Sequence, residues 1–275
     1  MSEIALEVRD ARFRWAKRSE DQFHHVNLSL RRGEVCAVLG PNGAGKTTFL
    51  RCLMGLLPWS EGETLLFGEP MRRKGEREIW RLMAYVPQAR SQQVAYTVEQ
   101  MVLLGRAPRL GVFAKPGERD VRLARETMET LEIGHLRDRL CTRISGGELQ
   151  MVLIARALCA EPSIMILDEP ESNLDYKNQQ NILRILKRLA SESSISILFN
   201  THYPEHALRL ADQTLLIHRG QTTVGRSDAL LNDENLSRLF SIPIAVREIA
   251  LNERTYAVVV PLSDEKEAGL KAERG

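Results

Sequence analysis

Apolar and polar residues alternate along the start of the chain, which predicts half-buried antiparallel strands. The alternation covers residues 4–8, 11–15 and 26–30. Residues 35–39 are instead all apolar, a pattern typical of a strand that is buried on both faces. The chain is therefore predicted to begin with a small antiparallel sheet that leads into a buried strand.

Further short strands are predicted along the rest of the chain, and helical patterns separate most of them. Their expected positions are residues 62–68, 83–88, 163–167, 195–201, 214–218 and 222–225, of which the last two form a hairpin. Buried strands that alternate with helices indicate an α/β fold. The predicted architecture is an α/β core with an N-terminal antiparallel β subdomain.

Apolar residues recur with helical spacing in several segments. One helix is expected to begin near Phe49, and another covers residues 182–189. Residues 97–160 carry three helical stripes, interrupted by a loop at residues 106–117 that holds two prolines and two glycines. Such a helical insert in an α/β chain is expected to bind a partner.

The end of the chain is less regular. Residues 226–262 predict a short amphipathic helix that includes Leu236 and Leu239, and a strand at residues 256–260. Residues 263–275 are charged and poor in large apolar side chains, so this tail is expected to be disordered.

A phosphate-binding loop is predicted between the strand at residues 35–39 and the helix that follows. The segment fits the pattern G-x-x-x-x-G-K-[ST], with a strand before it and a helix after it as the motif requires. Its residues are Gly40, Pro41, Asn42, Gly43, Ala44, Gly45, Lys46 and Thr47, and Thr48 follows. An ordinary glycine-rich turn before a lysine is the alternative, and the flanking elements argue against it.

The composition of this loop suits the binding of a triphosphate. Glycines let backbone N–H groups approach the phosphates, and the N-terminus of the helix adds free N–H groups and partial positive charge. Lys46 would supply a charge for the β- and γ-phosphates, and the hydroxyl of Thr47 would bind Mg²⁺. ATP and Mg²⁺ are the expected ligands.

Composition narrows the class of protein. The 275 residues carry a formal net charge of +2, which is not the strongly basic balance of a nucleic-acid-binding protein. No apolar run is long enough to cross a bilayer, and the first residues do not form a signal peptide. The four cysteines lie among apolar residues without C-x-x-C spacing, so they are expected to be core residues in a reducing compartment.

Acidic residues follow the buried strand at residues 163–167. Asp168 is expected to accept from a water on Mg²⁺, and Glu169 to polarise the attacking water, because α/β sheets bind ligands at the carboxyl ends of their strands. Two acids that simply form a turn are the alternative. Gln88, at another strand end, is either a surface amide or a neighbour of a metal-bound water, and His202 either contacts the γ-phosphate or caps the next helix.

A second glycine-rich segment precedes a helix at Ser145, Gly146, Gly147 and Glu148. It offers exposed N–H groups for an anion, although an ordinary helix N-cap is the simpler interpretation. Trp15 ends a predicted strand and would be either a core residue or an aromatic that stacks on a base.

Taken together, these motifs resemble those of the nucleotide-binding subunits of ATP-binding-cassette (ABC) transporters. The resemblance rests on the phosphate loop at residues 40–48, Gln88 of the glutamine loop, the signature at residues 144–148, the Walker B acids Asp168 and Glu169, the D-loop at residues 172–175 and the switch histidine His202. They stand in the order and spacing of the family and cover residues 4–225.

The resemblance implies a P-loop NTPase fold with a mixed sheet, in which residues 1–225 form the ABC ATPase domain and residues 89–160 its helical subdomain. Residues 226–262 would be an extension packed on this core. It also implies that Trp15 stacks on adenine, that Thr47, Gln88 and Asp168 serve the metal, and that Lys46, Glu169 and His202 are catalytic. A second copy of the chain would supply residues 145–148 to each ATP in a head-to-tail dimer.

The resemblance further implies transmembrane permease subunits as partners, an indirect link to a substrate-binding protein, no role for nucleic acid, and a peripheral position on the cytoplasmic face of the membrane. The segment from Tyr96 to Gly111 is similar to that of importers of iron–siderophore, haem and cobalamin. Molybdate and tungstate importers share much of it, including a run like that at residues 113–116. A soluble ATPase of cluster assembly is a further alternative, which the G-R-x-P segment at Arg106 disfavours.

Two positions depart from the family pattern. Ile144 replaces the leucine that usually begins the signature, which is a conservative change. Glu171 stands where the family usually has threonine, close to Glu169. The extra acid would either raise the pKa of Glu169 by repulsion or point to solvent, and a solvent-facing side chain is the preferred expectation.

Overall fold

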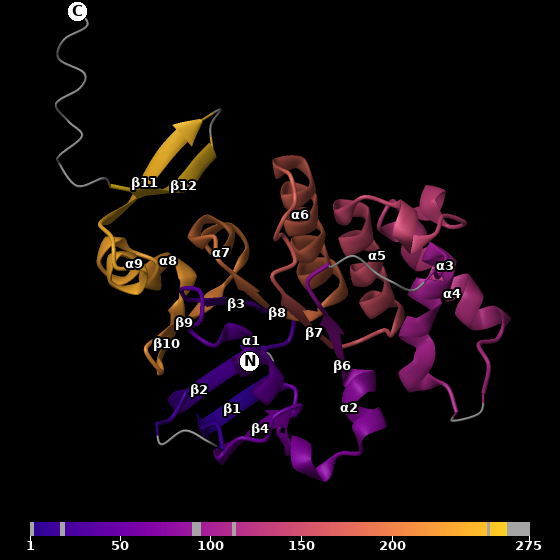
Figure 1. Ribbon diagram of the computed structural model, residues 1–275, viewed down its shortest axis with the longest axis horizontal. Coiled ribbons are helices and arrows are strands. Elements are labelled where there is room, and N and C mark those ends of the chain that lie inside the picture. The colour runs from indigo at the N-terminus through magenta and orange to yellow at the C-terminus, as the bar shows by residue number, and fades with distance from the viewer. Residues whose placement is uncertain (1–2, 17–19, 90–94, 112–113, 252–253, 263–275) are drawn as a thin grey trace, which may run out of the picture.

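The computed structural model describes residues 3–16, 20–89, 95–111, 114–251 and 254–262 (Figure 1). The tail at residues 263–275 and part of the run at residues 113–116 lie outside these ranges. Among the residues that the structure describes, no helix combines the length and the apolar character needed to cross a bilayer.

A six-stranded sheet forms the centre of the molecule, and its strand order is β10-β9-β3-β8-β7-β6. The strands β3, β6, β7, β8 and β9 run parallel to one another, and β10 pairs antiparallel with β9. The bounds are β3 (Val35–Leu39), β6 (Met83–Val86), β7 (Ile164–Asp168), β8 (Ser196–Thr201), β9 (Gln213–His218) and β10 (Gln221–Arg226). This confirms the predicted mixed sheet and its terminal hairpin.

A second, antiparallel sheet lies below the first in Figure 1 and has the order β2-β1-β4-β5. Its strands are β1 (Ile4–Phe13), β2 (Phe23–Arg31), β4 (Glu61–Leu66) and β5 (Glu69–Pro70). The expectation of two strands at residues 4–8 and 11–15 is wrong, because residues 4–13 form the single strand β1 and residues 14–15 lie beyond it. A bulge at Asp10, whose φ is 39°, shifts the buried positions from Leu6 and Val8 to Ala11 and Phe13 without ending the strand.

Nine α-helices are recorded within the described ranges. Their bounds are α1 (Lys46–Leu53), α2 (Glu76–Leu82), α3 (Val98–Leu103), α4 (Glu118–Thr130), α5 (Gly146–Cys159), α6 (Tyr176–Ser193), α7 (Pro204–Leu210), α8 (Ser227–Leu230) and α9 (Asp233–Phe240). A 3₁₀ helix, η2 (Leu104–Arg109), follows α3 directly. Helices α3, α4 and α5 confirm the predicted helical insert, which lies to one side of the sheet (Figure 1).

Strand β3 contributes to two hydrophobic cores, as its uniform apolar pattern predicts. Val35, Ala37 and Leu39 face the core that includes the helices α3 to α7, whereas Cys36 and Val38 face the core between the two sheets. Helix α1 packs in this second core through Phe49, Leu50 and Leu53. The phosphate loop joins β3 to α1 and is therefore held between two rigid layers.

The C-terminal part adds a hairpin of β11 (Ile244–Leu251) and β12 (Arg254–Pro261) beyond α9. Leu236 and Leu239 of α9 are buried in the same core as the central helices. The pattern predicted α9 and β12 but not β11, because most of β11 is exposed and its residues do not alternate in burial. All four cysteines are free and buried, as expected.

Candidate active site

The phosphate loop leaves β3 at Leu39 and enters α1 at Lys46, with Gly45 as the N-cap residue. Gly43 and Gly45 have φ values of 79° and 100°, which favour glycine. A Cβ atom on Gly40 would lie 2.6 Å from the carbonyl oxygen of Ile217, so the loop runs too close to β9 for a side chain there. The glycines of the motif are therefore required by the backbone itself.

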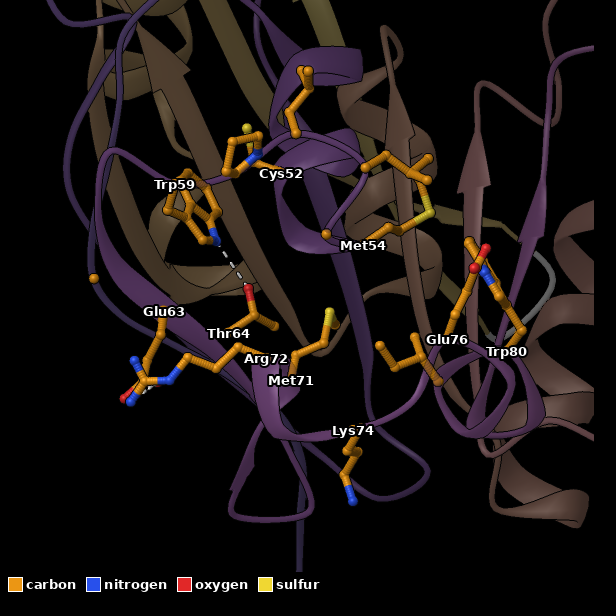
Figure 2. Close-up of a pocket in the computed structure, with 16 residues that line it drawn as sticks. Cys52, Met54, Trp59, Glu63, Thr64, Met71, Arg72, Lys74, Glu76 and Trp80 are labelled. Atoms are coloured by element: carbon orange, nitrogen blue, oxygen red, sulfur yellow. Dashed lines mark hydrogen bonds and ion pairs between the residues drawn. The ribbon is translucent and has the colours of Figure 1, made fainter.

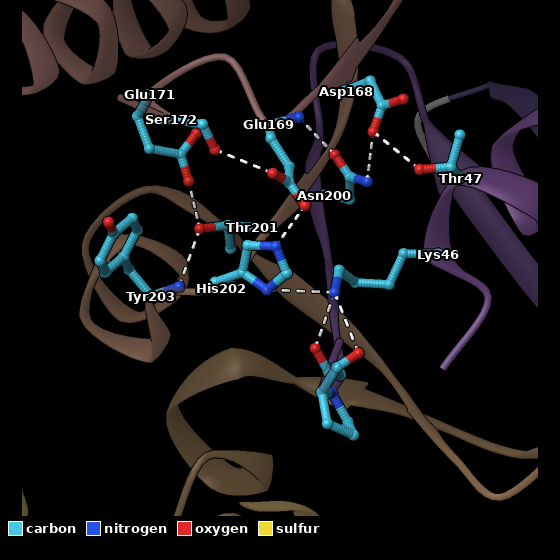
Figure 3. A network of polar contacts seen from close by, with 12 residues as sticks. Lys46, Thr47, Asp168, Glu169, Glu171, Ser172, Asn200, Thr201, His202 and Tyr203 are labelled. Atoms are coloured by element: carbon cyan, nitrogen blue, oxygen red, sulfur yellow. Dashed lines mark hydrogen bonds and ion pairs between the residues drawn. The ribbon is translucent and has the colours of Figure 1, made fainter. Parts of the chain in front are cut away.

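Lys46 is almost completely buried, with 5 % of its surface exposed. Its ammonium group donates to the carbonyl oxygens of Gly40 at 2.8 Å and Pro41 at 3.2 Å, and its Nζ lies 3.2 Å from Nδ1 of His202 (Figure 3). Burial lowers the pKa of Lys46 from its usual value, and the carboxylates of Glu169 and Asp168 oppose this decrease. The charge therefore lies at the base of the loop, facing both acids.

Asp168 ends β7 at the same sheet edge as the phosphate loop. Its Oδ1 accepts from Thr47 Oγ1 at 3.2 Å and from the side-chain amide of Asn200 at 2.6 Å, and its Oδ2 accepts from the Tyr85 hydroxyl at 3.1 Å. Three elements thus fix one carboxylate: α1, β8 and β6. The predicted closeness of Thr47 and Asp168 agrees with the geometry.

Glu169 follows Asp168 and has a φ of 47°. This value lies in the left-handed region of backbone conformation, which residues other than glycine rarely adopt. Its N–H donates to Oδ1 of Asn200 at 2.5 Å, and its Oε2 accepts from Ser172 Oγ at 2.9 Å. Its Oε1 contacts Nε2 of His202 (Figure 3). The carboxylate and the imidazole are thus paired beside the Lys46 ammonium.

Two further predicted site residues, Gln88 and Trp15, make none of the hydrogen bonds described above. Gln88 is half-buried two residues after Val86, which pairs with Leu167, so it follows the strand next to Asp168. Trp15 comes after β1, packs edge-to-face on Phe13 with ring centroids 5.0 Å apart, and keeps 38 % of its surface exposed. The Trp15 side chain is therefore only partly covered by the protein.

The signature segment caps α5. Ser145 Oγ accepts from the N–H of Glu148 at 3.2 Å, and Glu148 Oε2 accepts from the N–H of Ser145 at 2.7 Å, a capping box. Within the described residues, no hydrogen bond or ion pair links residues 145–148 to the phosphate loop. Ser145 and Gly146 are exposed and Gly147 is buried against Asn178, so the segment is open to a partner.

The expectation that Glu171 points to solvent is wrong. Only 1 % of its surface is exposed, and its Oε1 accepts from the hydroxyl of Thr201 at the end of β8. Glu169 and Glu171 point in different directions, the first toward His202 and the second toward Thr201 (Figure 3). The sequence shows that position 171 is acidic, but it does not show that Thr201, thirty residues away, donates a hydrogen bond to it.

The donors at the edge of the sheet suit Mg²⁺. This ion prefers oxygen ligands and keeps several waters when it binds a nucleotide, so it needs few protein ligands. Thr47 offers a hydroxyl, Asp168 a carboxylate and Gln88 an amide oxygen, and all three follow or begin elements that converge at this edge. The chemistry of these side chains therefore fits the ion.

Several residues that shape the site are not obvious from the motifs. Asn200 bridges Asp168 and the backbone of Glu169, Tyr85 bonds to Asp168, and Ser172 bonds to Glu169. Asn200 directly precedes the Thr201-His202 pair on a buried strand, and a polar residue there is the signal that could have pointed to it.

Comparisons with known proteins identify the family of this chain. A family model described as ABC transporter matches residues 23–172. The molybdate import ATP-binding protein MolC of Haemophilus influenzae is 35 % identical over 87 % of this chain and 90 % of its own length. A probable iron chelatin transport ATP-binding protein of Helicobacter pylori is 31 % identical over 88 % of this chain and 94 % of its own.

Solved structures give the same result. A metal-chelate type ABC transporter in an inward-facing conformation has a chain with a TM-score of 0.86 and 33 % identity, covering 94 % of this chain and 98 % of that one. The cbiO1 protein of Clostridium perfringens, part of the cbiONQ transporter complex, has a TM-score of 0.75 and 27 % identity, with 86 % and 94 % coverage. The chain therefore belongs to the ATP-binding, ATP-hydrolysing subunits of ABC transporters.

Proposed function

We propose that this chain is the ATPase subunit of an importer that takes up chelated metal, of the iron–siderophore, haem or cobalamin kind. The similarity to the metal-chelate type transporter, which extends over 94 % of the chain, carries this proposal. The iron chelatin relative and the segment from Tyr96 to Gly111 support it. Import of molybdate is the second candidate, which the relative MolC supports at 35 % identity.

Hydrolysis in this proposal depends on three side chains that act on ATP and the attacking water, and on three more that lie beside the metal. Lys46 and the loop amides bind the β- and γ-phosphates, and Lys46 exchanges its bonds to the Gly40 and Pro41 carbonyls for bonds to phosphate. Glu169 orients the attacking water and accepts its proton, and His202, paired with Glu169, contacts the γ-phosphate. Mg²⁺, bound near Thr47, Asp168 and Gln88, would neutralise charge on the phosphates.

The exposed signature supports a head-to-tail dimer in which Ser145 and Gly146 of one copy reach the ATP of the other. In one copy these residues begin α5, in the helical subdomain, and the phosphate loop begins α1 in the core (Figure 1). The N-terminus of α5 presents free N–H groups that suit an anion. A second copy is the partner that brings such an anion to it.

Two neighbouring hollows support a permease docking surface at the cytoplasmic face of the membrane. The first is a cavity of about 550 Å³ between the end of α1, β4 and α2 (Figure 2). The second lies among α2, β6, η2 and α5. Trp80 lines both, and Leu56 and Leu104 are exposed beside them. The exposed apolar side chains suit the cytoplasmic loops of the permease, and through it the chain would serve a substrate-binding protein.

Hydrolysis and closure are tested together by comparing the wild type with Glu169→Gln. We expect Mg²⁺-dependent ATP hydrolysis in the wild type and a loss of about a hundredfold or more in the variant, because the amide cannot accept the proton. The variant should also accumulate an ATP-bound dimer in size-exclusion chromatography with light scattering. Equal rates in the two proteins would contradict the role of Glu169.

The cargo is tested on the complete transporter in proteoliposomes, with its binding protein. Stimulation of ATP hydrolysis by a ferric siderophore, haem or cobalamin, and not by molybdate, is the expected outcome. Stimulation by molybdate alone would favour the second candidate.

A further inference from the structure

Glu171 carries a buried carboxylate whose burial is not explained by its hydrogen bonds. It lies three residues after Asp168, with 1 % of its surface exposed, and its Oε1 accepts from Thr201 Oγ1. Its other oxygen, Oε2, has no hydrogen-bond partner within the described residues. Burying a carboxylate with a single bond is unfavourable, so a chain that keeps one there is expected to use it.

The hydroxyl that Glu171 binds is part of the turn that carries His202. Thr201 Oγ1 donates to Glu171 and accepts from the N–H of Tyr203 at 3.0 Å, so it closes a small loop around His202 (Figure 3). Without Glu171, the hydroxyl of Thr201 would lose the acceptor that fixes its direction. The orientation of the His202 backbone therefore depends on a carboxylate from another strand end.

Asn200, the residue before Thr201, makes a second link between the same two strand ends. Its side chain donates to Asp168 and accepts from the N–H of Glu169. Two consecutive residues of β8 are thus tied to the first and last acids of residues 168–171. Glu169 lies between the two acids that are tied, and His202 directly follows the two residues that tie them, so both links act on the relative position of Glu169 and His202.

His206 completes the buried group from α7. It has 4 % of its surface exposed, and its Nδ1 lies 3.5 Å from Glu171 Oε1 without a hydrogen bond. The ring stacks obliquely near Tyr203, with centroids 4.8 Å apart. The imidazole is thus the second polar neighbour of the carboxylate oxygen that accepts from Thr201.

We propose that Glu171 is a positioning residue for ATP hydrolysis, which holds His202 against Glu169 through the hydroxyl of Thr201. The proposal rests on the proposed roles of Glu169 and His202. It concerns turnover and not nucleotide binding, because neither Glu171 nor Thr201 contacts the phosphate loop or Lys46 in the described contacts. The link also joins the segment before the D-loop to the switch histidine within one copy.

Kinetics of the full chain, assembled with its transporter if the chain alone is inactive, test this link. We expect Glu171→Ala to lower kcat about tenfold while the KM for ATP changes less than about twofold, because a misplaced catalytic pair slows only chemistry. Glu171→Gln should stay within about twofold of the wild type, since its amide oxygen still accepts from Thr201. Glu192→Ala, an exposed glutamate on α6, is the matched control.

Variants of Thr201 complete a double-mutant cycle with Glu171. They also test the link if Glu171→Ala does not fold. Thr201→Val should lower kcat as Glu171→Ala does, and Thr201→Ser, which keeps the hydroxyl, should restore it. The double variant should lose no more than either single one, because both break the same link. Additive losses, or a loss of kcat that merely follows the loss of folded protein in a thermal melt, would overturn the proposal.

Histidine ring signals in NMR provide a readout that does not need turnover. The chain has six histidines, and the signals of His202 are assigned by comparison with His202→Asn. We expect Glu171→Ala to shift them and Glu171→Gln and Glu192→Ala to leave them in place. An unchanged His202 in Glu171→Ala would refute the link even if ATP hydrolysis behaves as proposed, whereas a shifted His202 with wild-type kcat would refute its role in hydrolysis.

Discussion

Single residues set the conformation of the phosphate loop. Gly45 and Gly43 both have positive φ, but only Gly45 is also crowded, because a Cβ there would lie 2.9 Å from the ring of Phe23. We expect Gly45→Ala to destabilise the fold by about 2 kcal/mol, from backbone strain and the clash together. Thermal or urea unfolding measures this loss, and binding of a fluorescent ATP analogue should weaken with it.

Gly43→Ala is the control, because the same added methyl group would meet nothing within 4 Å. It should cost about 1 kcal/mol, from the positive φ alone. If the two variants were equally stable, contact with Phe23 would not contribute.

Residues within the motifs could be predicted from the sequence, and their neighbours in space could not. Lys46, Thr47, Asp168, Glu169 and His202 converge as their strand-end positions predict. The burial of Glu171 could not be predicted, because it depends on Thr201 of another strand. The hydrophobic pattern of the sequence predicts that a residue stands at the end of a strand. The direction of its side chain depends on contacts with the neighbouring strand, which the pattern does not show.

At the scale of elements, the start of α5 combines capping with charge. Glu148 accepts from the N–H of Ser145, and this hydrogen bond holds the pKa of Glu148 below its usual value of 4.5. A lowered pKa stabilises the fold at pH values above 4.5, and the stabilisation is lost as the pH falls through the lower pKa of the folded state. We expect Glu148→Gln to be less stable by at most about 0.5 kcal/mol at pH 7.

Unfolding by urea across the pH range measures this difference. The wild type and Glu148→Gln should converge once the pH has fallen below the lowered pKa of Glu148 in the folded state, because both side chains are then neutral and can still accept from the N–H of Ser145. Glu148→Ala should remain less stable both at pH 7 and in acid, since it lacks the acceptor. A gap between wild type and Glu148→Gln that is independent of pH would mean that charge does not contribute.

Elements themselves were predicted well where burial is periodic, and poorly where it is not. The uniform run of β3 and the stripes of α5 and α6 predicted those elements, and the bulge at Asp10 hid the continuity of β1. Strand β11 is mostly exposed, so no pattern marked it. A bulge or an unburied strand removes the periodicity on which such predictions depend.

Over the whole molecule, the docking surface proposed for the permease can be separated from the site of hydrolysis. Leu104 of η2 is 46 % exposed and lines the hollow among α2, β6, η2 and α5. We expect Leu104→Glu to reduce co-purification with the permease about tenfold or more, because a charge replaces an apolar contact. Dimerisation induced by ATP in the Glu169→Gln background should be unaffected.

Leu251→Glu is the matched control on the opposite part of the molecule. Leu251 is 54 % exposed at the end of β11, and in Figure 1 this hairpin lies far from η2 and α3. It should co-purify with the permease like the wild type. If Leu104→Glu and Leu251→Glu bound the permease equally well, the hollow that Leu104 lines would be excluded as the docking surface.

The backbone at Glu169 has a consequence for how this protein changes over time. With a φ of 47°, the residue occupies a conformation that glycine or asparagine adopts more easily than glutamate. Mutations to these residues would relieve strain and remove the proposed catalytic base in one step. Selection for stability and selection for turnover therefore act in opposite directions at this position. Where selection on transport is relaxed, we expect substitutions here that give a more stable protein, which binds ATP but does not hydrolyse it.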